Sequence, residues 1–308
     1  MNLRTLLGRP PATERPGINQ PVEVGQVEWL RDLDQALEQS SATGKPVFAL
    51  FQEVPGCAGC KQFGRDVLSN PVVVDGIEEA FVPLLIHNNT PGRDAQVLAA
   101  FGEPAWNYQV VRFLDDQADD IIPRRDRVWD TVPLVNRMVE TLTVAGRSVP
   151  AYLRLIEQEH AERLELVHFA QSCFWVGEME LGQIEGVVAT EAAFMGGHEV
   201  TSVWFDPQQV SLLDLSLQAQ SRRMASVIFA GDAGRAELEG SGLSVLPLDT
   251  SSYRVAPGRD QKHQIRSVRG LDDLSISQLT KVNAFFRSSA KKAAEYLAPS
   301  QRALVTGR

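Results

Sequence analysis

The chain has 308 residues, of which 44% are hydrophobic and 22% charged, a composition typical of a globular protein long enough for two domains. Its formal net charge of −9 disfavours a nucleic-acid partner, because binding to phosphates needs clustered basic side chains. The apolar stretch near the N-terminus is too short for a signal peptide, and no stretch reaches the about 20 apolar residues that span a bilayer. We therefore expect a soluble, cytoplasmic protein without a membrane partner.

The first half of the chain alternates predicted helices with short buried strands. Residues 1–21 contain four prolines and no periodicity, so we expect an irregular N-terminal arm there. Strands are predicted where short apolar runs are continuous, at residues 47–51, 81–86 and 110–114. Helices are predicted from apolar periodicity and stop signals at residues 27–39, 61–68 and 129–141.

A cysteine pair, Cys57 and Cys60, separates the first strand from the following helix. A Cys-x-x-Cys motif in this place resembles that of thioredoxin-like proteins, and the resemblance covers residues 22–145. A helix N-terminus favours the thiolate of Cys57, and Cys60, one turn later, can attack a mixed disulfide formed by Cys57. The proline that usually precedes the strand facing such a pair is missing near Gln109, so either segment 106–109 is rearranged or the site differs from that of ordinary thioredoxins.

Zinc binding is the alternative interpretation of this cysteine pair. A structural zinc site normally needs four ligands, and the nearest histidine, His87, lies 27 residues after Cys60. In a reducing cytosol three cysteines do not form a structural disulfide framework either. The sequence therefore favours a redox role, with no metal and no other resident cofactor.

The second half reads as a separate domain of strands interleaved with helices. A boundary rich in Gly, Ser and Pro and a predicted helix over 152–163 suggest a connector at residues 146–163, expected to pack between the domains. Strands are predicted at residues 165–170, 187–194, 199–205 and 226–229. Helices are predicted at residues 177–186, 210–218 and 275–297, the last broken near Ser288. This order predicts an α+β sandwich with helices over a mostly antiparallel sheet.

A third cysteine, Cys173, lies at the end of an apolar strand and is followed at once by Phe174 and Trp175. The segment Ser-Cys-Phe-Trp-Val resembles the Gly-Cys-Phe-Trp-Gly nucleophile motif of peptide methionine sulfoxide reductases of the A type. The later Gly-Gly pair matches as well, as does Glu199 at the start of a strand that ends in Phe-Asp-Pro. The match is strongest over residues 164–230, and it implies a ferredoxin-like α+β sandwich over residues 164–308.

This resemblance implies a chemistry for each of the matched residues. Cys173 would attack the sulfoxide sulfur, and Glu199, kept protonated in a partly apolar site, would protonate the departing oxygen. Phe174 and Trp175 would hold the methyl group and the carbons beside the sulfur. The products would be methionine and a sulfenic acid on Cys173, with the S epimer as substrate, in free or peptide form.

The chain departs from the family just before the predicted strand at 226–229. The family has an aspartate and a tyrosine there that help to hold the sulfoxide oxygen, whereas this chain has neither in residues 220–225. A different sulfoxide, a weaker enzyme or a changed function would each fit this absence, and Tyr253 is a candidate replacement. We expect three further polar residues to be solvated: Glu178, His198 and His263.

Many members of the family that the Cys173 segment resembles carry later resolving cysteines, and none follows Cys173 here, so the Cys57–Cys60 pair is a candidate for this role. We expect Cys57 to form a disulfide with Cys173 that Cys60 then opens, with an external thiol reductant, such as thioredoxin or another dithiol, closing the cycle. This predicts an enzyme of protein repair under oxidative stress. Two alternatives stay open: another thiol–disulfide oxidoreductase or peroxidase with the same cysteines, and a redox-regulated protein that binds sulfoxides without turnover.

Overall fold

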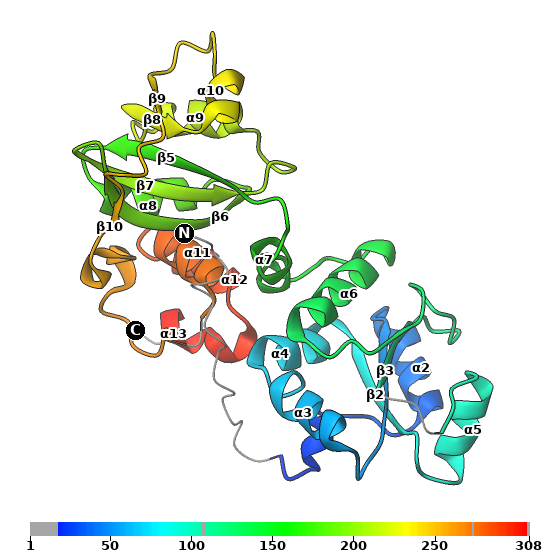
Figure 1. The fold of residues 1–308 in the computed structure, drawn as a ribbon. Coiled ribbons are helices and arrows are strands. Elements are labelled where there is room, and N and C mark those ends of the chain that lie inside the picture. The colour runs from blue at the N-terminus through cyan, green and yellow to red at the C-terminus, as the bar shows by residue number, and fades with distance from the viewer. Residues whose placement is uncertain (1–17, 106–108, 273, 307–308) are drawn as a thin grey trace. The chain divides into compact units, whose positions relative to one another are not determined.

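The computed structural model describes residues 18–105, 109–272 and 274–306, and its contacts divide the chain into two compact units (Figure 1). Among these residues, the first unit contains 18–157 and 298–300, and the second contains 158–297 and 301–306. Within the described ranges, no helix is long and apolar enough to cross a membrane.

The first unit is a four-stranded sheet with helices on both faces. The strands are β1 (Val47–Gln52), β2 (Val82–His87), β3 (Val110–Leu114) and β4 (Arg125–Asp126), in the order β2-β1-β3-β4. The central strand β1 is buried along its whole length and pairs parallel with β2 and antiparallel with β3. A strand covered on both faces is apolar without alternation, which is why its continuous apolar run predicted it correctly.

Among the residues that the structure describes, seven helical segments surround this sheet. They are η1 (Val22–Val24), α2 (Leu33–Thr43), α3 (Ala58–Asp66), α4 (Pro71–Ala80), α5 (Arg93–Ala100), α6 (Thr131–Val144) and α7 (Ala151–Glu159). One sheet face carries Phe48 and Phe113 and forms a core with α3, α4 and α6. The other face carries Ala49 and Phe51 and packs against α2 and α5.

Two of these helices, α4 and α5, were not predicted from the sequence. Helix α4 contains three consecutive valines, which lower helix propensity because their χ1 freedom is lost. Its start is nevertheless well defined, since the Asn70 side chain accepts a hydrogen bond from Val72 N and Pro71 occupies the first turn. Burial of Val73 and Ile77 in the core outweighs the weak propensity.

Helix α7 falls in the segment predicted as a connector. Tyr152 and Leu153 are fully buried in the core of the first unit, and the Tyr152 hydroxyl donates a 2.6 Å hydrogen bond to Glu79 Oε2. Gly76 in α4 allows this packing, because a Cβ there would lie 2.9 Å from Leu153. The first three residues of α7 are thereby fixed to one unit.

The second unit is built on a six-stranded sheet in the order β10-β6-β7-β5-β8-β9. The strands are β5 (Glu165–Gln171), β6 (Val187–Met195), β7 (His198–Phe205), β8 (Val227–Ala230), β9 (Val245–Pro247) and β10 (Arg254–Val255). All neighbours pair antiparallel except β8 and β9, which are parallel, so the sheet is mixed. Strands β6 and β7 form a hairpin that turns at Gly196 and Gly197, both with positive φ.

The helical segments of this unit are α8 (Phe174–Gly182), α9 (Leu212–Ser221), α10 (Asp232–Glu237), η2 (Gly258–Asp260), η3 (His263–Ile265), α11 (Ile276–Phe285), α12 (Ala290–Glu295) and α13 (Ala303–Thr306); η4 (Pro299–Gln301) crosses from one unit to the other. Helices α8 and α9 cover the sheet face that carries Val167, Phe169 and Phe205. The break expected near Ser288 is present, between α11 and α12.

Candidate active sites

The first candidate site is the cysteine pair at the N-terminus of α3. Cys57 is the N-cap residue and is exposed, whereas Cys60 lies in the first turn and is buried. Their sulfur atoms are 3.4 Å apart, close enough for a hydrogen bond between the thiols. The residues between them are small, and a Cβ on Gly59 would lie 3.3 Å from the Trp129 ring.

The two thiols differ strongly in acidity. The pKa of Cys57 is lowered, chiefly because its sulfur accepts a hydrogen bond from the backbone N–H of Cys60 and also one from the Cys60 thiol. Burial raises the pKa of Cys60 to about 12. Of the two sulfurs, Cys57 is therefore the more readily ionised and the better suited to attack a disulfide, whereas the Cys60 thiol is held protonated.

Three residues missed in the sequence lie around the loop before Cys57: Glu23, Gln52 and Glu53. The buried Gln52 side chain donates a 2.6 Å hydrogen bond to the Glu23 carbonyl oxygen, and Glu23 Oε1 accepts a 2.9 Å hydrogen bond from Gly56 N. Glu53 places a carboxylate oxygen within 4.8 Å of both sulfurs. Glu53 follows β1 directly and precedes Cys57 by four residues. This short separation is the signal in the sequence that could have identified Glu53 as part of the site.

Glu53, Cys57 and Cys60 together offer three ligand atoms, one fewer than a structural zinc site requires. Within the described ranges, the one cis peptide bond joins Val54 and Pro55. Residues 106–108, where the sequence suggested a rearranged segment, lie outside the described residues. Gln109 is buried and donates a 3.1 Å hydrogen bond to the Val128 carbonyl oxygen.

The second candidate site surrounds Cys173. This residue is the N-cap of α8, is half-buried, and makes no capping hydrogen bond through its sulfur. Glu199 Oε2 accepts a 2.9 Å hydrogen bond from Phe174 N, so the carboxylate lies at the start of the same helix. In the described part of the chain this is the one hydrogen bond of that carboxylate. The structure thus brings Cys173, Phe174 and Glu199 together.

Four rings extend from this point in what we call the aromatic row, made of Phe194, Phe174, Trp175 and His263. Phe194 and Phe174 lie edge to face with ring centres 5.4 Å apart, and Phe174 and Trp175 follow at 6.2 Å. Trp175 stacks on the His263 ring at 3.9 Å with an angle of 13° between the planes. The expectation of a freely solvated His263 was therefore wrong, whereas His198 is exposed as expected.

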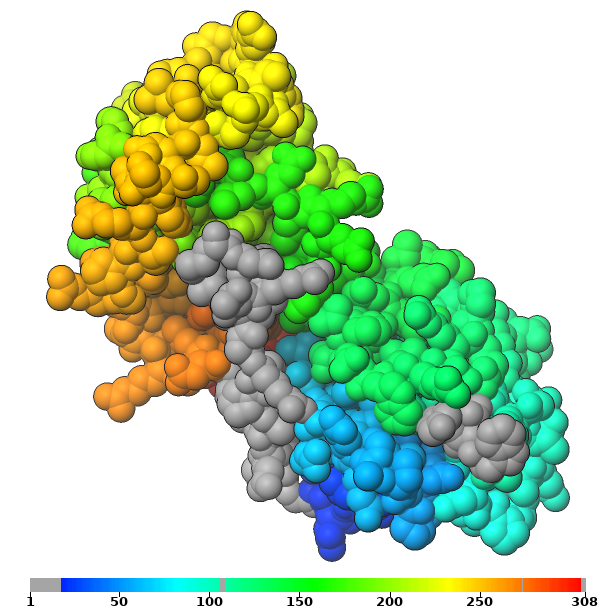
Figure 2. Space-filling view, viewed as in Figure 1, coloured from blue at the N-terminus to red at the C-terminus, as the bar shows by residue number. Residues whose placement is uncertain are grey.

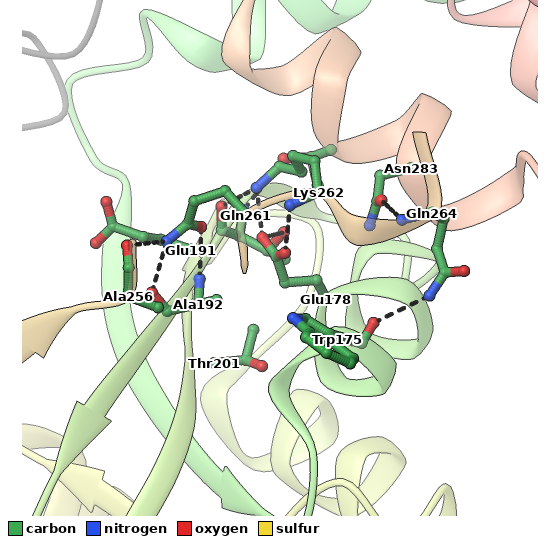
Figure 3. Close-up of polar contacts among 12 residues, drawn as sticks. Trp175, Glu178, Glu191, Ala192, Thr201, Ala256, Gln261, Lys262, Gln264 and Asn283 are labelled. Atoms are coloured by element: carbon green, nitrogen blue, oxygen red, sulfur yellow. Dashed lines mark hydrogen bonds and ion pairs between the residues drawn. The ribbon is translucent and has the colours of Figure 1, made fainter. Parts of the chain in front are cut away.

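Glu178 is not solvated, contrary to the sequence expectation. Its side chain is fully buried and forms an ion pair with Lys262 Nζ at 2.5 Å, and the Lys262 N–H donates to its other oxygen at 2.7 Å (Figure 3). Lys262 Nζ also donates to the Thr190 carbonyl oxygen at 2.6 Å. The pair ties α8 to the segment that carries His263, 84 residues away, and so holds the Trp175–His263 stack in place.

Tyr253 does not replace the family's missing oxygen-binding groups. Its hydroxyl donates to Glu191 Oε2 at 2.6 Å and lies 3.1 Å from Ser202 Oγ. Ser202 and Glu199 differ by an odd number of positions along β7, so their side chains lie on opposite sheet faces. Tyr253 accordingly joins a buried cluster with Ser202 and His168, where burial lowers the pKa of His168 to about 4.

The comparisons with known proteins bear first on the cysteine pair. A family model described as Thioredoxin-like matches residues 28–124, which include β1, α3 and both cysteines. This region is a thioredoxin-like domain. The prediction from the Cys-x-x-Cys motif is thereby confirmed, and a pair of unequal thiols at a helix N-terminus of such a domain is the arrangement of a thiol oxidoreductase.

Two solved structures resemble parts of the chain. Methionine sulfoxide reductase A of Corynebacterium diphtheriae is similar at 20% identity over 34% of this chain and 75% of its own, with a TM-score of 0.28. A DsbH oxidoreductase is similar at 16% identity over 46% of this chain and 97% of its own, with a TM-score of 0.33. No curated protein matches the chain.

Proposed function

We propose that the protein reduces methionine sulfoxide to methionine in a thiol-dependent reaction centred on Cys173. The observation that carries the proposal is the joint placement of Cys173 and Glu199 at the N-terminus of α8, beside the aromatic row. A sulfoxide needs a sulfur nucleophile, a proton donor for its oxygen and an apolar surface for its methyl group, and these residues supply all three.

The order of the sheet supports the same assignment. The segment β5-α8-β6-β7-α9-β8 has the strand order β6-β7-β5-β8 with every pair antiparallel. A β-α-β-β-α-β unit of this kind is a ferredoxin-like arrangement. It places the loop after the central strand β5, which carries Cys173, next to the start of β7, which carries Glu199.

The reaction proceeds in two stages. Cys173 Sγ attacks the sulfoxide sulfur while Glu199 gives a proton to the oxygen; methionine leaves, and the oxygen ends on Cys173 as a sulfenic acid. Cys57 then attacks this sulfur and releases water, forming a Cys57–Cys173 disulfide. Cys60 opens that disulfide, which frees Cys173 and leaves a Cys57–Cys60 disulfide for an external dithiol protein to reduce.

Turnover of a blocked methionine sulfoxide tests this proposal. Reduced protein is supplied with excess dithiothreitol and each sulfoxide epimer separately, and release of the thioether is followed. We expect turnover of the S epimer alone, complete loss in Cys173→Ser, and a loss of about 100-fold in Glu199→Gln, the contribution typical of a general acid. Glu165→Gln, an exposed glutamate on β5, serves as the matched control and keeps full activity.

Either of two results would count against a part of the proposal. Turnover of neither epimer excludes methionine sulfoxide as the substrate and leaves a disulfide or peroxide substrate, whose exchange with a thiol does not need Glu199 as an acid. Full activity of Glu199→Gln towards the sulfoxide would keep sulfoxide reduction but overturn the role of Glu199 as proton donor.

A further inference from the structure

Arginines without an ion pair in the described part of the chain act on both ends of the aromatic row, Arg254 on Phe194 and Arg266 and Arg287 on His263. At one end the Arg254 guanidinium carbon lies 5.5 Å from the centre of the Phe194 ring. At the other end, burial lowers the pKa of His263, and the charges of Arg266 and Arg287 lower it further. A row of rings with cations at its ends is suited to a ligand that is apolar in the middle and anionic at its edge.

The register of the sheet places Arg254 close to the reacting groups. Arg254 on β10 lies opposite Phe194 on β6, and Phe194 lies opposite Glu199 on β7. Paired residues of neighbouring antiparallel strands project from the same face, so all three side chains share the face covered by α8. A single ring, Phe194, separates the Arg254 guanidinium from the proposed proton donor.

These cations have no carboxylate partners. Across the described ranges, no ion pair involves Arg254, Arg266 or Arg287. Two carboxylates that act on His263 are already paired with other cations, since Glu178 pairs with Lys262 and Asp260 lies 3.8 Å from Arg259. In a chain with a net charge of −9, these arginines are available to bind an anionic group.

We propose that the sulfoxide substrate carries a carboxylate near the oxidised sulfur and that Arg254 binds this carboxylate. The inference rests on the proposed function and names its substrate class. Arginine suits the role because its planar guanidinium can form two parallel hydrogen bonds to a carboxylate while it lies against a ring. The α-carboxylate of free methionine sulfoxide and an aspartate beside an oxidised methionine in a peptide both supply this chemistry.

Binding to the Cys173→Ser protein tests the proposal without requiring turnover. Three S-sulfoxide ligands are titrated by calorimetry: N-acetylmethionine sulfoxide, its neutral amide, and an amidated peptide with aspartate on both sides of the sulfoxide. We expect at least one carboxylate ligand to bind about tenfold more tightly than the neutral amide, with the difference reduced at high salt. The first ligand represents the free amino acid and the third represents an acidic peptide.

Adding Arg254→Ala should remove this preference and leave binding of the neutral amide unchanged. Arg235→Ala is the matched control, because it removes an exposed arginine from α10, where Arg235 pairs with Asp232. Equal binding of charged and neutral ligands, or a preference that survives Arg254→Ala, overturns the inference.

The same ligands are also offered to the unmodified protein for turnover. Turnover that is equal for charged and neutral ligands keeps the proposed function and overturns the role of Arg254. Carboxylate-dependent binding without turnover of any ligand would support the carboxylate-binding role of Arg254. It would overturn sulfoxide reduction as the proposed function.

Discussion

At the residue scale, Cys57 and Cys60 differ in exposure and in acidity, and this difference predicts which of them reacts first. Cys57 is exposed and its pKa is lowered, whereas burial raises the pKa of Cys60 to about 12. Because only the thiolate reacts with alkylating agents, iodoacetamide at pH 7 should modify Cys57 well before Cys60. Peptide mass spectrometry after short exposures measures both rates. The pH at which Cys57 reacts at half its maximal rate should lie below the about 8.5 of an ordinary thiol.

The Cys60→Ala variant separates the two causes of this lowered pKa. The variant loses the thiol hydrogen bond but keeps the backbone N–H at position 60, which is the larger contribution. The half-maximal pH should therefore rise only part of the way towards that of an ordinary thiol. A complete return to the ordinary value, or equal alkylation of both cysteines in the unmodified protein, would contradict this account.

At the element scale, the position of α8 depends on a close contact with the sheet. A Cβ on Gly177 would lie 2.3 Å from Thr201 Oγ1 and 2.6 Å from the Gln171 amide nitrogen, and these two side chains are hydrogen-bonded to each other at 2.7 Å. Gly177→Ala should therefore push the helix outward and lower the free energy of unfolding by about 2 kcal/mol. Denaturant unfolding measures the loss, and activity should fall further because Cys173 and Phe174 begin this helix.

The control for this substitution is Gly258→Ala, because a Cβ on Gly258 meets nothing within 4 Å. It should change the unfolding free energy by less than about 0.5 kcal/mol. If Gly177→Ala were equally harmless, α8 would not depend on close contact at this position.

The elements also show what the sequence could and could not predict. Local patterns predicted the strand at 110–114 and the helix break near Ser288, because apolar runs and stop signals are local properties. The start of α8 was placed at Gly177 instead of Phe174, so the position of Cys173 as an N-cap was missed. The buried Glu178–Lys262 pair joins residues 84 positions apart. Local sequence patterns cannot predict a contact between residues so far apart in the chain.

Some residues of the candidate sites could likewise be predicted from the sequence, and others could not. Cys57, Cys173 and Glu199 were found because their motifs resemble known families, and the hydrogen bond from Phe174 N now places Glu199 beside Cys173. Arg254 was missed because its relation to the site exists only through strand pairing. Exposed arginines are common in any sequence, and only the register shows which one faces a functional group.

At the scale of the whole molecule, the chain joins a thioredoxin-like domain to a unit that carries a lone third cysteine. If the proposed relay operates, the tether gives Cys57 an effective concentration near Cys173 that is independent of how dilute the protein is. The Cys60→Ser variant should then accumulate a Cys57–Cys173 disulfide after one equivalent of sulfoxide, because no thiol remains to open it.

Trapping this disulfide at several protein concentrations separates a relay within one chain from exchange between chains. We expect the rate of disulfide formation, followed by mass spectrometry of cross-linked peptides, to stay constant over a hundredfold dilution, with the product monomeric on non-reducing gels. Cys57→Ser is the control and should leave Cys173 as a sulfenic acid, since the remaining Cys60 is buried and its pKa is raised. A rate proportional to protein concentration, with covalent dimers as product, would mean that the resolving thiol comes from a second molecule. The shared chain would then not explain how Cys173 is reduced.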